Sequence, residues 1–305
     1  MSAFNVSDEV ISALADDRPV VALESTLIAH GLPWPMNLDT AREAENAVRE
    51  GGAVPATIAI IRGVPTIGLR DDELVYCAET PGVFKASRRD LGAAIALGRS
   101  AATTVSATMA IAHATGIKVF ATGGIGGAHR TTEQFSCDPF DISADLTELA
   151  RTPVLVVCAG AKSILHLPRT LEILETLGVP VLGYRTDEFP AFYVARSGLA
   201  VSSRVESPFE AASVFAAHTR LGGGGAVLAQ PCPADVAIPA EEFNAWLEEA
   251  EVKAHETKMA GPHLTPFLLA RLAELSSGRT LKANRALIVA NASLAAEVAV
   301  ALTGK

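Results

Sequence analysis

Aromatic residues are scarce in this sequence of 305 residues, where they make up only 5%. The apolar share is nevertheless 49%, and it consists mainly of alanine, valine, leucine and isoleucine, which suit close packing of helices on a sheet. Charged residues make up 19% of the chain. A sequence of this length and apolar content can bury a large core, so intrinsic disorder is excluded.

Cysteine is also rare, and no two of the four residues Cys77, Cys137, Cys158 and Cys232 form a CxxC pair. The alternative is a disulfide or zinc framework, and the wide spacing of the cysteines argues against both. We expect free thiols, as in the reduced proteins of the cytoplasm.

Basic residues are outnumbered by acidic ones, 25 to 34, which gives a formal net charge of −9. This balance argues against a nucleic-acid partner, although a few local cations can still bind a small anion. No run approaches the roughly 20 uninterrupted apolar residues that a membrane-spanning helix needs. The first residues carry acids where a signal peptide has basic residues before an apolar segment. We therefore expect a cytoplasmic protein without a membrane partner.

Short apolar runs rich in β-branched residues alternate with longer helical patterns, which is typical of α/β proteins. No linker or internal repeat stands out, so residues 1–305 are predicted to form a single compact α/β domain. Its central, largely buried mixed sheet should be covered by helices on both faces. The predicted strands are Val20–Leu23, Thr57–Ile61, Thr66–Leu69, Val119–Ala121, Val154–Cys158, Val181–Tyr184 and Ala226–Leu228. The predicted helices are Asp39–Glu50, Arg89–Gly98, Ala107–Ala114, Ile142–Ala150, Ser163–Leu177, Pro208–Arg220, Ala240–His255, Pro266–Ser276 and Ala283–Leu302.

Glu24 follows an apolar strand directly, in the segment VALESTLIAHG. A carboxylate in this position is partly desolvated, which raises its pKa and suits it to proton transfer. The alternative is a structural carboxylate that caps the following turn, and the segment alone leaves both interpretations open.

Four glycines follow another strand in the segment FATGGIGGAHR. Their backbone N–H groups can approach an anion closely, and Thr122, His129 and Arg130 are further possible donors. The segment lacks the lysine and hydroxyl of a Walker loop and the GxGxxG spacing of a dinucleotide site. Anion binding and tight backbone packing both remain open.

Asp141 and Asp145 stand four residues apart in FDISADL, which places both on one face of the predicted helix. Like charges at this spacing repel each other unless a cation or a ligand hydroxyl compensates, and an all-oxygen shell suits Mg²⁺ or Mn²⁺. The alternative is that Asp141 caps the helix.

Lys162 follows a fully apolar strand and a small turn in VLVVCAGAKSIL, at the start of a predicted helix. Desolvation and the positive end of the helix both disfavour the ammonium form, so we expect a lowered pKa. A neutral lysine is a nucleophile for carbonyl carbons. The alternative is a lysine whose amine reaches the solvent.

The other conspicuous residues form no motif. The histidines show neither HxH nor HExxH spacing, and we expect most of them to be structural or exposed. Glu248, Glu249 and Glu251 are predicted to form a solvent-exposed helix face.

Taken together, these segments resemble the pseudouridine-5′-phosphate glycosidase family, which includes relatives of indigoidine-cluster protein A. The similarity covers nearly the whole chain, through ALESTLIAHGLPWPMN, FKASRRDL, ATGGIGGAHR, FDISADL, VVCAGAKSIL and LKANRALIVANA. It implies reversible cleavage of the C–C glycosidic bond of pseudouridine 5′-phosphate to uracil and ribose 5-phosphate, in pseudouridine catabolism. It also implies Mn²⁺ as the cofactor, with Mg²⁺ as a substitute, and a homotrimer.

The resemblance also assigns roles to individual residues. Lys162 matches the lysine that forms a Schiff base, Glu24 the proton donor, and Asp141 the metal ligand. The substrate contacts of the family match Lys85, Val105, Thr122, His129, Ser143, Ala144, Asp145 and Asn284, with Thr122 and His129 on the phosphate side. The match of the asparagine is open, because Asn291 lies nearby.

The residues also suit this chemistry on their own terms. A C-nucleotide has no anomeric heteroatom, so the usual mechanism with two carboxylates lacks a leaving oxygen. An amine at C1 of the ring-opened ribose supplies an iminium instead, and the C–C bond breaks as a proton reaches the uracil carbon. Lys162 and Glu24 are the expected amine and acid, and the group of Lys85, Thr122 and His129 is expected to hold the phosphate.

Two other functions compete with this interpretation. A sugar-phosphate kinase would need a phosphate site for ATP, and the sequence has no Walker lysine. A non-catalytic sensor of sugar phosphates would keep the pocket but would not need Lys162 or Glu24.

Overall fold

The computed structural model describes residues 4–130, 141–259 and 264–304. Within these ranges eleven strands form one sheet, in the order β1-β4-β3-β2-β7-β8-β11-β9-β10, with β6 paired to β3 and β5. The strands are β1 (Asn5–Val6), β2 (Val20–Glu24), β3 (Val54–Ile61), β4 (Val64–Ile67), β5 (Phe84–Ala86), β6 (Ala101–Thr103), β7 (Val119–Ala121), β8 (Leu155–Cys158), β9 (Val181–Tyr184), β10 (Ser203–Val205) and β11 (Ala226–Ala229).

The centre of the sheet is parallel: β2, β7, β8, β11 and β9 run side by side in one direction. Because β3 is antiparallel to β4 and β6, the sheet is mixed, as the sequence predicts. The central strand β8 is buried along its whole length. Since neighbouring parallel strands end at the same edge, the residues after β2, β7 and β8 meet at one place.

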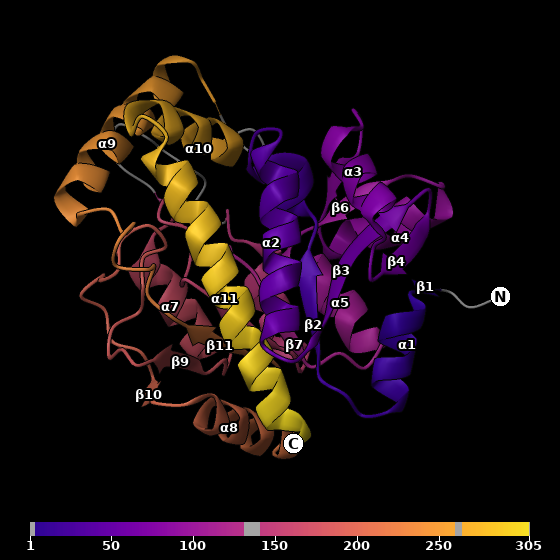
Figure 1. Ribbon diagram of the computed structural model, residues 1–305. Helices are drawn as coiled ribbons and strands as arrows, with labels where there is room; N and C mark the ends of the chain where they lie inside the picture. Colours follow the sequence, from indigo (N-terminus) through magenta and orange to yellow (C-terminus); the bar gives the residue numbers. More distant parts are fainter. Residues whose placement is uncertain (1–3, 131–140, 260–263, 305) are drawn as a thin grey trace.

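Helices cover both faces of the sheet (Figure 1). Helix α2 (Met36–Glu50) and helix α11 (Arg279–Thr303) pack against each other on one face, and α5 (Val105–Ala114) packs on β2 and β3 from the other. The remaining helices are α1 (Asp8–Ala15), the π-helix η1 (Leu27–Gly31), α3 (Asp71–Glu79), the 3-10 helix η2 (Arg88–Asp90), α4 (Leu91–Ala96), α6 (Ala144–Arg151), α7 (Leu167–Thr176), α8 (Pro208–Arg220), α9 (Ala240–Glu256) and α10 (Leu264–Leu275).

Helix α11 is long and apolar enough, by composition, to cross a membrane. In this structure it packs on α2, α8, β7 and β8. Its residues Ala283, Leu287 and Ala292 are fully buried. A helix in the centre of a core is apolar for this reason, so its composition is explained by its neighbours.

The predicted elements differ from the structure mainly where elements are short. The bounds of β7 and β9 are as predicted, and the other predicted strands shift by up to three residues at an end. Strands β1, β5, β6 and β10 were not predicted, because two or three residues show no periodicity. Helices α1 and α3 were not predicted either, although acidic residues mark their first turns.

Two helices of the site begin later in the structure than predicted, which changes the surroundings of Asp141 and Lys162. The helix predicted over 142–150 begins at Ala144, because Ser143 is its N-cap and accepts a hydrogen bond from the Asp145 N–H at 3.2 Å. Asp141 therefore lies before this helix, so neither the shared helical face nor the capping role predicted for it is correct. The helix predicted over 163–177 begins at Leu167, after the cap His166.

Three of the four cysteines lie within the described residues, and they are buried free thiols as predicted. Burial raises the pKa of the Cys158 thiol to about 12, which makes it unreactive. Cys137 lies outside the described residues.

Candidate active site

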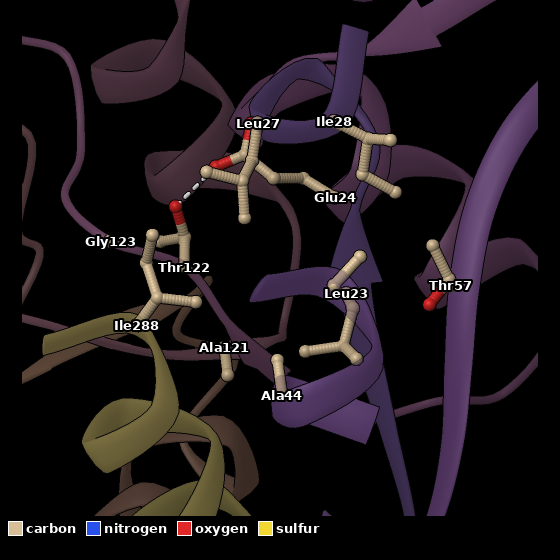
Figure 2. A pocket seen from close by; sticks show the side chains of 11 residues that line it. Leu23, Glu24, Leu27, Ile28, Ala44, Thr57, Ala121, Thr122, Gly123 and Ile288 are labelled. Atoms are coloured by element: carbon tan, nitrogen blue, oxygen red, sulfur yellow. Dashed lines mark hydrogen bonds between the residues drawn. The ribbon is translucent and has the colours of Figure 1, made fainter. Parts of the chain in front are cut away.

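Glu24, Thr122 and Lys162 meet where three adjacent parallel strands end. Glu24 is the last residue of β2, Thr122 directly follows β7, and Lys162 lies in the loop after β8. The hydroxyl of Thr122 donates a hydrogen bond to the carboxylate of Glu24, as Figure 2 shows. The fold therefore brings together the two residues expected to perform the chemistry.

Burial has the largest effect on the pKa of Glu24. Desolvation raises the pKa of its carboxyl group, while the charge of Lys162 and the hydrogen bond from Thr122 offset part of this rise. The nearby negative charge of Asp145 raises the pKa further. The raised pKa predicted for Glu24 is thus confirmed, and it suits a group that donates a proton.

The loop that carries Lys162 is fixed by backbone pairing with the glycine segment. The Lys162 N–H donates to the carbonyl of Ile125 at 3.1 Å, and the Ile125 N–H donates to the carbonyl of Gly160 at 3.0 Å. Gly160 has a φ of +83°, and a side chain there would collide with the carbonyl of Pro190, so the turn requires glycine. Because α7 begins only at Leu167, Lys162 is not at a helix N-terminus, and the predicted effect of the helix dipole on its amine was wrong.

The glycine segment uses several of its amides inside the protein. The Gly126 N–H donates to Asp145 at 2.8 Å, and the His129 N–H donates to the carbonyl of Asp141 at 3.1 Å. A Cβ atom at Gly126 would lie 2.3 Å from the hydroxyl oxygen of Ser143. Tight backbone packing, one of the two interpretations left open, therefore explains this part of the segment.

Asp145 joins two parts of the site. Its Oδ1 accepts a hydrogen bond from the Ser106 N–H at 2.9 Å, and its Oδ2 accepts the bond from Gly126. Val105, the first residue of α5, is buried beside this contact, and Ala144 is exposed at the start of α6. Asp145 thus holds the start of α5 against the glycine segment through charge-assisted hydrogen bonds.

The amine of Lys85 and the imidazole of His129 lie close enough to Lys162 to feel its charge. Desolvation lowers the pKa of each, and the charge of Lys162 lowers both pKa values further. Lys85 lies exposed on β5, and the charges of Glu24 and Asp145 oppose the lowering of its pKa. Lys85, His129 and Lys162 therefore lie close enough for their charges to influence one another.

Asp141 lies next to His129. Its carboxylate is 39% exposed, and its Oδ2 lies 3.9 Å from Nε2 of His129. Among the residues that the structure describes, no cluster of three or more His, Cys, Asp or Glu side chains could hold a metal ion. A single exposed carboxylate suits only an ion that keeps most of its ligands as water, as Mg²⁺ does.

The two asparagines of α11 have different surroundings. Asn291 is fully buried, donates to the carbonyl of Thr122 at 2.8 Å and accepts from Gln230 at 2.9 Å. Asn284 is 8% exposed and lies one helical turn before Ile288, which lines a cavity next to Glu24. Asn291 therefore supports the chain at Thr122.

That cavity borders Glu24 and has a volume of about 20 Å³. It is lined by Leu23, Glu24, Leu27, Ile28, Ala41, Ala44, Thr57, Ala121, Thr122, Gly123 and Ile288. Figure 2 shows Glu24 and Thr122 on one side of it and Thr57 on the other. The space is too small for a nucleotide but large enough for about one water molecule.

Glu251 was wrongly predicted to be solvent-exposed. It is 8% exposed on α9, and its Oε1 lies 3.5 Å from Nε of Arg130, at the end of the glycine segment. Burial raises the pKa of the Glu251 carboxyl, and the charge of Arg130 opposes this rise. Leu247, four residues earlier and buried, marks the inward face of α9 and could have indicated this position.

Sequence comparisons support the same family. Residues 9–301 match the family described as indigoidine synthase A like protein. A pseudouridine-5′-phosphate glycosidase of Caldanaerobacter subterraneus subsp. tengcongensis is 54% identical over 299 residues, which cover 98% of this chain and 96% of that protein. A pseudouridine-5′-phosphate glycosidase of Herpetosiphon aurantiacus is 52% identical over 303 residues, 99% of each chain.

Solved structures with the same fold cover the chain from end to end. The prealnumycin C-glycosynthase AlnA in complex with ribulose 5-phosphate superposes with a TM-score of 0.91 at 42% identity, over 100% of this chain and 98% of that one. An indigoidine synthase A-like protein of Thermotoga maritima gives a TM-score of 0.88 at 35% identity, over 99% and 98% of the two chains.

Proposed function

The chain belongs to the indigoidine synthase A-like protein family, and we propose that it is a pseudouridine-5′-phosphate glycosidase. It cleaves the C–C glycosidic bond of its substrate to give uracil and ribose 5-phosphate. The observation that carries this function is a buried glutamate of raised pKa placed beside a lysine at the ends of adjacent strands. Relatives more than half identical carry this name, and a related C-glycosynthase binds a pentose phosphate.

The reaction starts from the free amine of Lys162. Its nitrogen forms a bond to C1 of the ribose while the bond from C1 to the ring oxygen breaks, and a proton from the nitrogen converts the ring oxygen to a hydroxyl. Glu24 then gives its proton to the uracil carbon, and the nitrogen lone pair expels uracil as the C–C bond breaks. Water then hydrolyses the iminium to ribose 5-phosphate and the free amine, and the proton that this step releases returns to the Glu24 carboxylate.

The other residues position the reacting groups. Thr122 donates to one oxygen of the Glu24 carboxylate, which fixes the direction of the carboxyl group. Lys85 and His129 bind the substrate phosphate by charge-assisted hydrogen bonds. The resemblance places Thr122 on the phosphate side as well, but its buried hydroxyl supports a role through Glu24.

We test this function by incubating the protein with pseudouridine 5′-phosphate and measuring the release of uracil. Added ATP should change nothing, which separates the glycosidase from a kinase. Ribose 5-phosphate and borohydride should add a reduced pentose phosphate to the peptide that contains Lys162. Lys162→Ala should lose both adduct and turnover, and Lys162→Arg should not restore them, because a guanidinium stays protonated. Labelling of a different lysine would contradict the mechanism.

We further propose that Asp141 binds Mn²⁺, with Mg²⁺ as a substitute. Its partly exposed carboxylate next to His129 supports a site where most ligands are water. The ion would add positive charge at the phosphate end of the site. Chelation by EDTA should lower activity, and Asp141→Ala should abolish Mn²⁺ binding measured by calorimetry while the melting temperature stays unchanged. Full activity after exhaustive chelation would contradict this assignment.

We also propose a homotrimer in the cytoplasm. The apolar share of 49% supports buried contacts between subunits. Large apolar side chains also remain exposed on the single chain, including Phe209 at 69% and Leu221 at 90% exposure near the two ends of α8.

A further inference from the structure

Ser163, the residue after Lys162, joins the loop that carries the lysine to a distant part of the chain. This lysine loop comprises residues 159–166, between β8 and α7. The Ser163 hydroxyl donates to the carbonyl of Ala191 at 2.6 Å and accepts from the Tyr193 N–H at 3.2 Å. Ser163 is 8% exposed. The mechanism described above does not use this serine.

The segment that Ser163 contacts, residues 189–194 between β9 and β10, has an unusual backbone. Phe192 has a φ of +62°, in the left-handed region that a bulky residue rarely adopts. Such a conformation costs energy and persists only where the surrounding structure fixes it. The Phe192 N–H donates to the carbonyl of Ala159 at 2.9 Å, and a Cβ atom at Gly124 would lie 2.6 Å from Cδ2 of the Phe192 ring. The segment is therefore packed tightly against both the lysine loop and the glycine segment.

The lysine loop is held from two sides. On one side the Ala159 N–H donates to the carbonyl of Gly123 at 2.9 Å, and the Lys162 N–H donates to the carbonyl of Ile125 at 3.1 Å. On the other side residues 189–194 contact the loop through the Phe192 N–H and the Ser163 hydroxyl. The Ser163 bonds depend on a side chain, so a substitution can remove them while the backbone bonds remain.

The position of the lysine backbone matters for the reaction. A lysine side chain has several rotatable bonds, so its amine reaches a fixed carbon reproducibly only if the chain at its Cα atom is fixed. A displacement of about 1 Å at a reacting group can cost on the order of 10²-fold in rate. Both bonds of Ser163 are made one residue away from that Cα atom.

We propose that Ser163 is a positioning residue that holds Lys162 where its amine meets C1 of the ribose, an inference that rests on the proposed glycosidase function. Ser163 does not touch the reacting atoms and acts only through Lys162. Its loss therefore slows the formation of the imine and leaves the groups that bind the phosphate in place.

The test is Ser163→Ala, which removes the hydroxyl and adds no bulk. Ribose 5-phosphate and borohydride report imine formation alone, through the rate at which the peptide containing Lys162 gains the reduced pentose phosphate. We expect this rate to fall about tenfold. With pseudouridine 5′-phosphate, kcat should fall by a similar factor while KM stays within about twofold.

Two further variants separate positioning from packing. Ser163→Thr keeps a hydroxyl and should restore both rates. Ser202→Ala is the matched control, because the Ser202 hydroxyl likewise donates to a carbonyl, that of Val181 at 2.7 Å, and accepts from an N–H, that of Val181 at 2.9 Å. Val181 begins β9, at the edge of the parallel strands opposite to the site, so this variant should react like the unmodified protein.

Unchanged trapping and turnover in Ser163→Ala would overturn the inference. A loss that Ser163→Thr does not restore would also overturn it, since packing would then explain the effect. If Ser163→Ala does not fold, Ser163→Cys replaces it, because a thiol fills the space but is a weak hydrogen-bond donor, and an unchanged trapping rate there has the same meaning. If the unmodified protein neither releases uracil nor traps ribose 5-phosphate, the proposed function itself fails, so the two failures are distinguishable.

Discussion

At the scale of a single residue, opposing effects act on the pKa of the Glu24 carboxyl group. Burial and Asp145 raise its pKa, whereas Lys162, Thr122 and Lys85 lower it. A proton donor must be protonated, so the titration of Glu24 should make kcat fall as the pH rises through the pKa of the folded Glu24 carboxyl group. This descending limb should lie above the range of an ordinary glutamate.

Replacement of Thr122 by valine tests this balance. Thr122→Val removes a hydrogen bond that lowers the pKa of Glu24, so the descending limb of kcat should move to higher pH. Thr122→Ser keeps a hydroxyl and should leave the limb in place. The measurement is kcat against pH for the three proteins, and a shift to lower pH would count against the assignment.

The residues of the site were predictable where local sequence decides their environment. The raised pKa of Glu24 follows from the apolar strand before it, which the sequence shows directly. The surroundings of Asp141 and Lys162 were not predictable, because the helix starts depend on the caps Ser143 and His166. The hydrogen bonds from Ser106 and Gly126 to Asp145 join residues distant in the chain, and no sequence pattern indicates them.

At the scale of elements, we predict separate roles for the two asparagines of α11. Asn291→Leu removes the donor to the Thr122 carbonyl and the acceptor for the Gln230 side chain, so the free energy of unfolding should fall by about 1–3 kcal/mol. Asn284→Ala should instead raise KM with little change in stability. Urea unfolding and steady-state kinetics of both variants measure these effects. A raised KM without loss of stability in Asn291→Leu, and a loss of stability in Asn284→Ala, would contradict the prediction.

The glycine segment tolerates no side chain where it crosses α6. A Cβ atom at Gly126 would lie 2.3 Å from the hydroxyl oxygen of Ser143 and 2.7 Å from Oδ2 of Asp145. Gly126→Ala should therefore lower the free energy of unfolding by about 1–3 kcal/mol and reduce kcat. Gly92→Ala is the control, because α4 has open space there and alanine favours a helix. Equal behaviour of the two variants would contradict this account.

The elements themselves were predicted best where they are long helices or continuous apolar strands. Helices α8 and α9 and the central strands are of these two kinds, and their bounds were close to those observed. Short edge strands such as β1 and β10 form because a neighbouring strand pairs with them. The local sequence does not show which strands will be neighbours, so these strands could not be predicted from it. The position of Lys85 could not be predicted for the same reason, because the pairing of β5 with β6 brings this residue to the site.

At the scale of the whole molecule, the proposed trimer predicts a sedimenting species of three times 31.7 kDa at micromolar concentration. Buried apolar contacts between subunits should keep it associated at high salt, since screening weakens exposed ion pairs but not hydrophobic contacts. Analytical ultracentrifugation over a range of concentrations measures this, and a monomer throughout would contradict the proposal.

The long-range pairing in this fold has a consequence for how the chain acquires activity. The bond between Glu24 and Thr122 joins residues 98 apart in sequence, and the bond between Glu43 of α2 and Arg285 of α11 joins residues 242 apart. Such contacts require large loops to close first, which slows folding relative to the formation of local helices. During refolding, circular dichroism should therefore recover before turnover does, because helices form locally while the reaction centre awaits distant strands.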